Sequence, residues 1–239
     1  MSTGVSSLTS IGQTRISAAR LAIIESHGAK GDLLKYYCAN CWGFELVALE
    51  RTGHGGAEAV TRTKPDLVLA GLTPADVTPV NYVNLLRRAA PSSKLILLAA
   101  QCLEYPVHLI MPTDFQGLIF DADESLNSME QAIESIRAGF RYVSPRIAAC
   151  QTAMRTGPTS FHKLLSRREQ EVLVCIAHSF SDAEIGTQLG LSSATALVHR
   201  RQIMRKLSIH STPKLIRYAM EKGFNAVPPP NAAKSRSNP

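Results

Sequence analysis

Residues 165–207 read LSRREQEVLVCIAHSFSDAEIGTQLGLSSATALVHRRQIMRKL, and this stretch decides how the C-terminal part of the chain folds. Its apolar residues recur every three or four positions, which is typical of amphipathic helices. Ser166 precedes the first helix with Glu169 three residues later, the spacing of a capping box. Ser181 precedes a second short helix, and Gly190 is placed to end it. The stretch therefore predicts short helices that share one small core.

A third helix begins after Ser192 or Ser193, because both are good N-cap residues. Helical spacing gives this helix a core-facing stripe of Ala196, Ile203 and Leu207. An opposite stripe holds Val198, Arg201 and Arg205. A fourth helix is expected at about 212–222, with an apolar face of Leu215, Ile216, Ala219 and Met220. Since a helix of this width fits the major groove of DNA, the sequence predicts an all-α helix-turn-helix domain.

Residues 165–224 resemble the DNA-binding domain of LuxR-type regulators, the NarL/FixJ family in particular, because the motifs keep the family's order and spacing. Two positions depart from the family. Leu197 stands where the family usually has a lysine that approaches DNA, which should change or weaken base reading. Arg200 stands where it usually has a core-facing valine, so its charge must reach the surface or be paired.

The expected DNA contacts fall into two groups. Helical spacing directs Val198 and Arg201 to base edges, and the alternative is that Arg201 contacts only the backbone. Arg205 and Lys206 lie further along and should meet phosphates. The family often has a histidine at the position of His199, near the phosphate backbone, although packing against the neighbouring helix is an equal alternative. The predicted DNA-binding residues are Ser192, Thr195, Leu197, Val198, His199, Arg201, Arg205 and Lys206.

Charge is unevenly distributed over the 239 residues. Residues 1–150 carry 13 Lys and Arg against 14 Asp and Glu, whereas residues 151–239 carry 13 against 5. A neutral half joined to a basic half suits one domain on double-stranded DNA and one elsewhere. The first residues hold no long apolar run, so no signal peptide is expected, and no window is long enough to cross a membrane. The five irregularly spaced cysteines favour a reduced bacterial cytoplasm.

Between residues 20 and 140, short apolar runs alternate with helix-like segments. The runs lie at about 21–24, 44–48, 67–70, 95–99 and 117–120, and the helices at about 28–40, 55–63, 78–89, up to 111, and 124–139. Buried strands alternating with helices predict an α/β flavodoxin-like fold with a five-stranded parallel sheet in the order 2-1-3-4-5. The expected division is a disordered tail at 1–18, this domain at 19–140, a linker at 141–162, the helix-turn-helix at 163–225 and a disordered tail at 226–239.

This α/β domain resembles the receiver domain of a response regulator. Residues 65–69 (PDLVL) look like a receiver's third strand, and residues 132–145 (AIESIRAGFRYVSP) look like its last helix and the start of the linker. The resemblance implies a phosphorylation pocket, but this chain has residues of different chemistry at the positions that form it. The residues at those positions are Glu25 and Ser26 for the two metal-binding acids, Gly71 for the phosphoacceptor aspartate, Ala99 for the switching hydroxyl and Asp121 for the lysine.

Glycine offers no nucleophile, one carboxylate is a poor Mg²⁺ site, and an aspartate in place of lysine repels an anion. We therefore expect an atypical receiver domain that takes no phosphate. Glu25 and Asp121 could together hold a cation, although two solvated acids are the simpler interpretation. Asp66 lies at the opposite end of its strand and is interpreted as structural. Cys38 and Cys41 form a CxxC pair, interpreted as thiols packing a helix end rather than as a redox or zinc site.

The sequence predicts a transcription regulator that binds promoter DNA as a dimer, independently of phosphorylation. No metal, cofactor or catalytic residue is expected. The receiver-like domain would serve dimerisation or the sensing of a protein or ligand, and another regulatory protein or RNA polymerase is a further candidate partner. Two alternatives stay open: a conventional response regulator phosphorylated at an unusual site, and an interaction protein that modulates another regulator.

Overall fold

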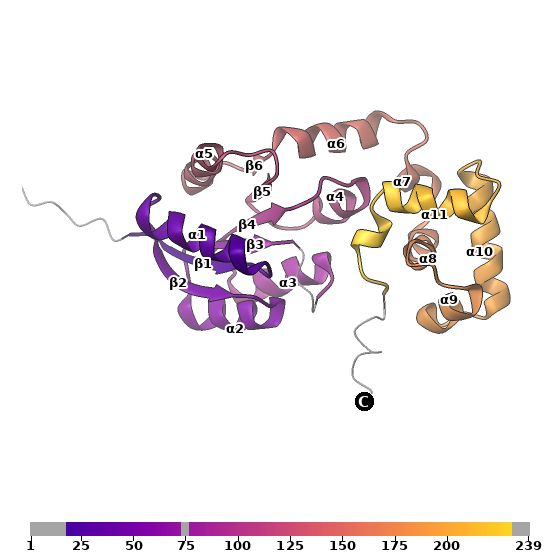
Figure 1. Cartoon of the computed structure of the whole chain (residues 1–239), viewed down its shortest axis with the longest axis horizontal. Helices are drawn as coiled ribbons and strands as arrows, with labels where there is room; N and C mark the ends of the chain where they lie inside the picture. Colours follow the sequence, from indigo (N-terminus) through magenta and orange to yellow (C-terminus); the bar gives the residue numbers. More distant parts are fainter. Residues whose placement is uncertain (1–17, 73–76, 231–239) are drawn as a thin grey trace, which may run out of the picture.

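The computed structural model describes residues 18–72 and 77–230. In the N-terminal domain a parallel sheet has the order β2-β1-β3-β4-β5-β6, which contains the predicted 2-1-3-4-5 order (Figure 1). The strands are β1 (Arg20–Ile24), β2 (Glu45–Glu50), β3 (Leu67–Gly71), β4 (Lys94–Ala99), β5 (Gly117–Phe120) and β6 (Tyr142–Val143). The sheet has six strands, so the prediction of five was wrong. The sixth was missed because two residues are too short to make an apolar run, yet Tyr142 and Val143 pair with Gly117 and Leu118.

Helices cover both faces of the sheet because side chains alternate along each strand. Ile23 packs with α1 (Gly28–Asn40) and α5 (Leu126–Arg137) on one face. Ile24 packs with the helices on the other face, which are α2 (Gly53–Thr63), α3 (Pro79–Ala89) and α4 (Glu104–Ile110). All five helices lie where the sequence places them, within a few residues.

The segment predicted as a linker is largely helical. After β6, the hydroxyl of Ser144 accepts a hydrogen bond of 2.9 Å from the Phe120 amide, which ties the segment to the sheet. It then forms α6 (Pro145–Thr156) and α7 (Phe161–Leu164). The segment was taken for a linker because the pattern before Phe161 shows no strong apolar stripe. Only Ile147 and Met154 of α6 are buried.

The C-terminal domain has the predicted helices: α8 (Arg167–Ala177), α9 (Asp182–Leu189), α10 (Ser193–Lys206) and α11 (Thr212–Glu221), followed by the 3₁₀ turn η1 (Phe224–Ala226). Both capping boxes form, Ser166 with Glu169 and Ser181 with Glu184. Gly190 ends α9 with a φ of 66°, a left-handed conformation that glycine adopts without strain. The sequence thus encodes the start and end of each helix locally.

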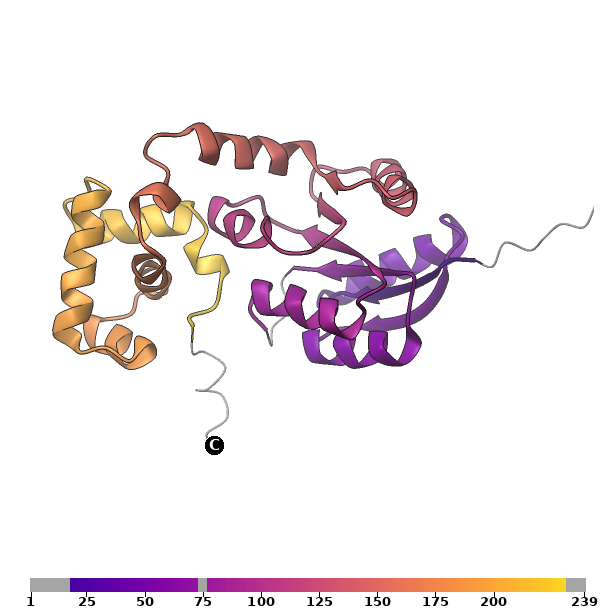
Figure 2. The same cartoon turned by 180° about the vertical axis from the view of Figure 1, so that it is seen from behind.

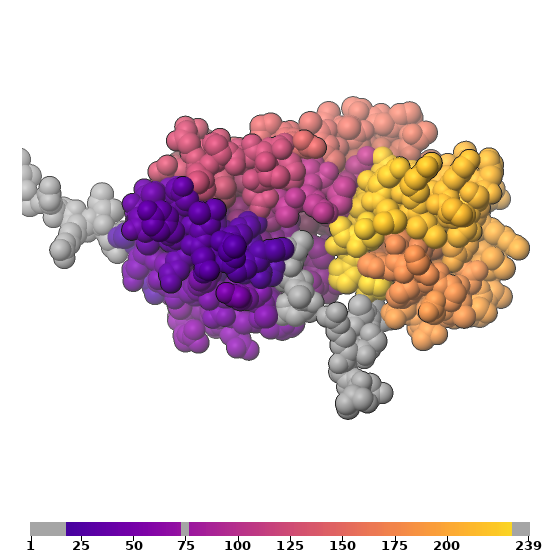
Figure 3. Space-filling model, viewed as in Figure 1, coloured from indigo at the N-terminus to yellow at the C-terminus, as the bar shows by residue number. Residues whose placement is uncertain are grey.

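The two domains meet at a seam made by α4 on one side and by α7 and η1 on the other. In Figure 3 the yellow C-terminal residues lie directly against the magenta part of the N-terminal domain. The ring of Tyr105 stacks on Phe224 with centroids 3.9 Å apart, and Phe161 lies edge-on to both rings. The Tyr105 amide donates a 2.9 Å hydrogen bond to the carbonyl of Lys222. Glu104 and Lys222 also form an ion pair across the seam. One continuous apolar cluster therefore joins the domains.

Beyond η1, Val227 is buried and its carbonyl contacts Nε2 of His178 at 2.9 Å. The sequence had assigned Val227 to a disordered tail, and that boundary was too early. It was misplaced because a lone valine before three prolines shows no helical or strand pattern. Residues 1–17 and 231–239, the remainder of the predicted tails, lie outside the described residues.

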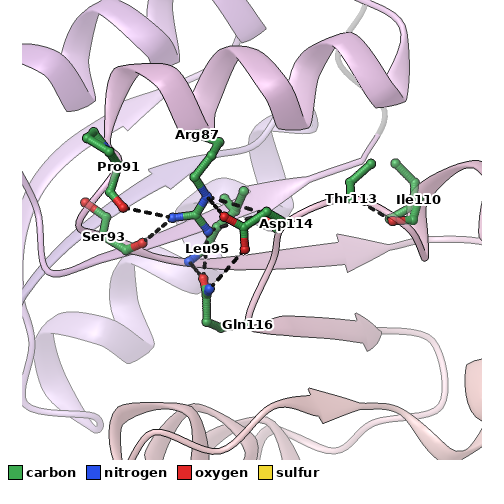
Figure 4. Close-up of polar contacts among 8 residues, drawn as sticks. All are labelled: Arg87, Pro91, Ser93, Leu95, Ile110, Thr113, Asp114 and Gln116. Atoms are coloured by element: carbon green, nitrogen blue, oxygen red, sulfur yellow. Dashed lines mark hydrogen bonds and ion pairs between the residues drawn. The ribbon is translucent and has the colours of Figure 1, made fainter.

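A polar network braces the edge of the sheet opposite the predicted pocket. Arg87, at the end of α3, donates to the carbonyl of Ser93 at 2.8 Å and to Oε1 of Gln116 at 2.8 Å, and pairs with Asp114 at 3.0 Å (Figure 4). Gln116 Oε1 also accepts from the Leu95 amide. One guanidinium therefore ties α3 to the starts of β4 and β5. On the same side, Asp66 accepts a hydrogen bond from the Arg20 amide, as its structural interpretation requires.

Candidate nucleic-acid interface and receiver pocket

Two fully buried residues, Ala196 and Ile203, anchor α10 in the C-terminal domain. Figures 1 and 2 both show α10 on the side of that domain that faces away from the sheet. Its outer stripe contains Val198, which is 49% exposed, and Arg201 and Arg205, which are both exposed. The predicted division of α10 into a core-facing and an outward stripe is confirmed.

The sequence left open whether the charge of Arg200 reaches solvent or is paired within the protein. The residue is only 9% exposed. Its Nε lies 2.8 Å from Oδ1 of Asp182 at the first turn of α9, and its Nη2 donates to the carbonyl of Phe180 at 3.2 Å. Arg200 is thus paired and joins α10 to the start of α9.

A shallow hollow on α10 is lined by Val198, Arg201, Gln202 and Arg205. A second one continues past the helix end and is lined by Arg201, Met204, Arg205, Ser208, Ile209 and His210. Gln202, Ser208 and His210 were not among the predicted contacts. Helical spacing alone places Gln202 next to Arg201, whereas Ser208 and His210 follow the helix and show no pattern.

Two other predicted contacts, Ser192 and Thr195, are bonded to each other. The hydroxyl of Ser192 caps α10 by accepting from the Thr195 amide at 3.0 Å, and the two hydroxyls lie 2.8 Å apart. Leu197 and His199 are both partly buried. The partial burial of His199 favours packing against its neighbours as its role. The DNA contacts of all eight predicted residues stay predictions.

Lys206 makes a contact that the sequence did not predict. Its Nζ lies 2.7 Å from Oε2 of Glu169, whose side chain is only 4% exposed. The same carboxylate accepts from the Ser166 amide at 2.8 Å, within the α8 capping box. Burial acts to raise the pKa of Glu169, but the hydrogen bonds from Lys206 and Ser166 outweigh it and hold this pKa below its usual value. Lys206 therefore has a structural partner in addition to any phosphate.

The predicted receiver pocket lies at the carboxyl ends of the parallel strands, where β1, β3, β4 and β5 bring Glu25, Gly71, Ala99 and Asp121 to one edge. The ammonium group of Lys30, from the first turn of α1, lies between the two carboxylates. Its Nζ is 2.8 Å from Oε2 of Glu25 and also contacts Oδ2 of Asp121. The sequence analysis missed Lys30, because the contact depends on how the first turn of α1 lies over the strand ends.

Glu25 is held from a second side by its own loop. Its Oε1 accepts from the amide of His27 at 3.0 Å and lies 3.3 Å from the His27 ring. Burial acts to raise the pKa of Glu25, but the bonds from Lys30 and His27 keep it lowered overall. Burial likewise acts to lower the pKa of Lys30, but Asp121 and Glu25 raise it. Glu25 and Lys30 therefore both favour their charged forms, and Ser26 is partly buried beside them.

Gly71 has no room for a side chain. A Cβ built there would lie 2.7 Å from Oε2 of Glu25. That carboxylate is fixed by Lys30 and His27, so it cannot move away without losing these bonds. Glu25 thus fills the space where a phosphoacceptor side chain would start.

The fold brings Glu25 and Asp121 close together, as a shared cation would require, but the ammonium group of Lys30 lies between them. Across the residues that the structure describes, no group of three or more His, Cys, Asp and Glu could hold a metal ion. Cys38, in the last turn of α1, is buried and its burial raises its pKa to about 12, whereas Cys41 is exposed. Only Cys38 packs the helix end as the sequence led us to expect.

Comparison with known proteins agrees with this geometry. Residues 163–219 match the family described as bacterial regulatory proteins, luxR family. These residues form a LuxR-family helix-turn-helix domain. The chain is similar to the transcriptional regulatory protein MctR of Rhizobium johnstonii, with 26% identity over 205 residues that cover 86% of this chain and 94% of that one. It is also 28% identical to the oxygen regulatory protein NreC of Staphylococcus aureus over 192 residues, covering 74% of this chain and 86% of that one.

Over most of its length the chain has a fold similar to that of a solved response regulator. RcsB from Salmonella enterica serovar Typhimurium, bound to a promoter in the presence of a phosphomimetic, superposes with a TM-score of 0.60. The identity is 16%, and the match covers 86% of this chain and 99% of that one. The family match and the curated relatives, together with this fold, make the chain a transcription regulator of the response-regulator type with a LuxR-family DNA-binding domain. Within the described residues, no helix is both long and apolar enough to span a membrane.

Proposed function

We propose that this regulator binds promoter DNA as a dimer through α10 and needs no phosphate on its receiver-like domain. The observation that carries the proposal is the ion pair of Lys30 with Glu25 and Asp121, beside Gly71. In place of a metal ion and an acceptor, the pocket contains its own cation and a filled acceptor space. The charge of the pocket would then stay constant, because no phosphoryl group is added to it or removed from it.

Three physical terms oppose phosphorylation. Gly71 supplies no nucleophile. A divalent cation would have to displace Lys30, which already neutralises one of the two carboxylates. Without that cation, a phosphoryl group would approach Glu25 and Asp121 at a few ångströms and be repelled. The alternative acceptors fare no better, because Glu25 is held by two partners and Asp66 bonds the Arg20 amide at the opposite edge.

The domain arrangement supports DNA binding without such a switch. The seam uses α4, α7 and η1, and leaves the outer stripe of α10 free of contact with the receiver-like domain. Arg201 and Arg205 add positive charge to this stripe, which suits the phosphate backbone and the base edges of a major groove. DNA can therefore reach α10 in the conformation that the structure shows.

Dimerisation is expected because a single α10 can contact only a short stretch of DNA. One recognition helix covers only a few base pairs, so proteins of this kind pair on two half-sites. Four large apolar side chains on the described surface are candidates for the dimer interface: Leu33 and Tyr36 on α1, Phe140 after α5 and Met220 on α11.

Incubation of the full chain with acetyl phosphate and Mg²⁺, followed by intact mass spectrometry, tests the proposal. We expect no phosphoryl addition and an unchanged dissociation constant for promoter DNA. Sedimentation should show a dimer on DNA with or without the phosphodonor. The double variant Lys30→Ala/Gly71→Asp, which releases Glu25 from its ion pair and supplies a carboxylate at position 71, is treated in parallel. Stable phosphorylation of the unmodified chain at Glu25 or Asp66 would reject the proposal.

A second candidate function is an interaction protein that modulates another regulator or RNA polymerase. The exposed pair Leu33 and Tyr36, one helical turn apart on α1, is the observation that favours it. The double variant Leu33→Ser/Tyr36→Ser separates the two. Loss of the dimer assigns the pair to self-association, whereas loss of a captured partner with the dimer intact assigns it to a second protein.

A further inference from the structure

Two cysteines that neither site uses lie together near the seam. Cys102 is in the loop between β4 and α4, and Cys150 is on α6. The Sγ of Cys102 lies 3.7 Å from the carbonyl oxygen of Arg146, in the first turn of α6. Helical side chains lean towards the N-terminus, so the thiol of Cys150 lies over the turn that begins at Arg146. The two thiols are close enough for each to influence the pKa of the other, and neither residue is fully buried.

We propose that Cys102 and Cys150 are a redox-responsive pair that closes into an intramolecular disulfide and fixes α6 against the start of α4. The oxidant class is a low-molecular-weight disulfide. The thiolate of Cys102 attacks one of its sulfurs, which forms a mixed disulfide and releases one small thiol. The thiolate of Cys150 then attacks Sγ of Cys102 and releases the second small thiol. Two electrons and two protons pass from the pair to the oxidant.

The surroundings set the order of these steps. Burial raises the pKa of both thiols, that of Cys150 to about 12. For Cys102 the charge of Arg146 partly opposes this effect, so Cys102 is the more available thiolate. The pair therefore stays reduced in a reducing compartment and responds only to sustained oxidation.

The position of the pair gives the bond a structural consequence. Leu103, the next residue after Cys102, lies so close to Gly223 that a Cβ on the glycine would be 2.5 Å from the leucine Cβ. Tyr105 follows, with its amide bonded to the carbonyl of Lys222. The second cysteine, Cys150, is on α6, the helix that leads into the C-terminal domain. A disulfide here would tie together both connections between the domains and lock the seam.

The other three cysteines supply internal controls. Cys38 and Cys175 are buried in the two cores, whereas Cys41 is exposed at the end of α1. Cys41 should therefore take up one small thiol and retain it. Its variant Cys41→Ser removes that reaction without touching the pair.

The experiment treats the full chain with oxidised glutathione and maps its peptides without reduction. We expect one linked peptide pair joining Cys102 to Cys150, lighter than the two free peptides by two hydrogen atoms, and one glutathione on Cys41. Cys41→Ser should give the same link, and Cys102→Ser and Cys150→Ser should lose it. Hydrogen exchange of the peptide containing the Tyr105 amide should slow by about fivefold or more on oxidation, because local opening of the seam is suppressed.

Separate glutathione adducts on Cys102 and Cys150, or a link between two chains, would overturn the pairing. A Cys102–Cys150 link with unchanged exchange at Tyr105 would overturn the locking of the seam. Both readouts come from the unmodified chain, so a variant that fails to fold does not affect the result.

Discussion

Replacing Lys206 tests whether this residue stabilises the fold or contacts DNA. The structure pairs its ammonium with Glu169, at 2.7 Å. A hydrogen bond between charged groups contributes about 1.5–3 kcal/mol. Because the Lys206 side chain is 37% exposed, solvent screening reduces this to about 1–2 kcal/mol. Lys206→Ala should therefore lower the free energy of unfolding by about that amount, and leave Glu169 charged in a place that is only 4% exposed.

A double-mutant cycle with Glu169→Gln isolates the pair. Glutamine keeps the capping box with Ser166 but carries no charge. We expect a coupling of about 1–2 kcal/mol at neutral pH. The pKa of Glu169 is lowered in the folded state, so the contribution of the pair is fully present above the ordinary carboxyl pKa. It is lost as the pH falls through the lowered value.

The assay is urea unfolding followed by far-ultraviolet circular dichroism. The single tryptophan, Trp42, lies in the receiver-like domain and would not report on α8. DNA affinity is measured in parallel over a range of salt concentrations. If Lys206→Ala leaves stability unchanged but lowers the slope of log affinity against log salt by about one unit, Lys206 is a phosphate contact and the reasoning is refuted.

Three further outcomes follow from the structure. Arg201→Ala should cost about 1–3 kcal/mol of DNA binding and relax preference at one position of a panel of single-base operator variants, whereas an equal loss on every variant would make Arg201 a backbone contact. Asp182→Asn should destabilise the C-terminal domain by about 1 kcal/mol, because it weakens the pairing of the buried Arg200, and a chemical denaturation curve that matches the unmodified chain would contradict this. Arg87→Ala should lower the stability of the receiver-like domain by about 1–3 kcal/mol, read from Trp42 fluorescence, with DNA affinity of the folded protein unchanged.

The sequence predicted the elements whose signals are local. Buried strands appear as apolar runs, and Ser166, Ser181 and Gly190 mark helix ends by their own chemistry. The parallel order could be predicted because short apolar strands alternating with helices leave few topologies. The strand β6 was missed because Tyr142 and Val143 depend on Gly117 and Leu118 for their pairing, and two residues carry no periodicity.

The missed pairings of Lys30 and Lys206 share a different cause. Lys30 and Lys206 both look like ordinary surface lysines of helices, and helical spacing gives the face of a residue but not its partner on another element. Glu25 and Asp121 become partners of Lys30 only when the sheet brings β1 and β5 to one edge. Arg200 was the exception, because a charge on a core-facing stripe requires compensation whatever the partner is.

Lys30 and Arg200, one in each domain, are both paired with carboxylates of the chain itself. In the receiver-like domain Lys30 pairs with the carboxylates of Glu25 and Asp121. In the DNA-binding domain an arginine with a fixed partner stands on the core-facing stripe of the recognition helix. Both charges are compensated within the chain, so neither depends on a ligand to be stable. We therefore expect a signal to act where the domains meet, at the seam that contains Tyr105, Phe161 and Phe224. Weakening that apolar contact is therefore expected to change how α10 is presented to DNA, while changes inside the pocket of Lys30 should alter only the stability of the receiver-like domain.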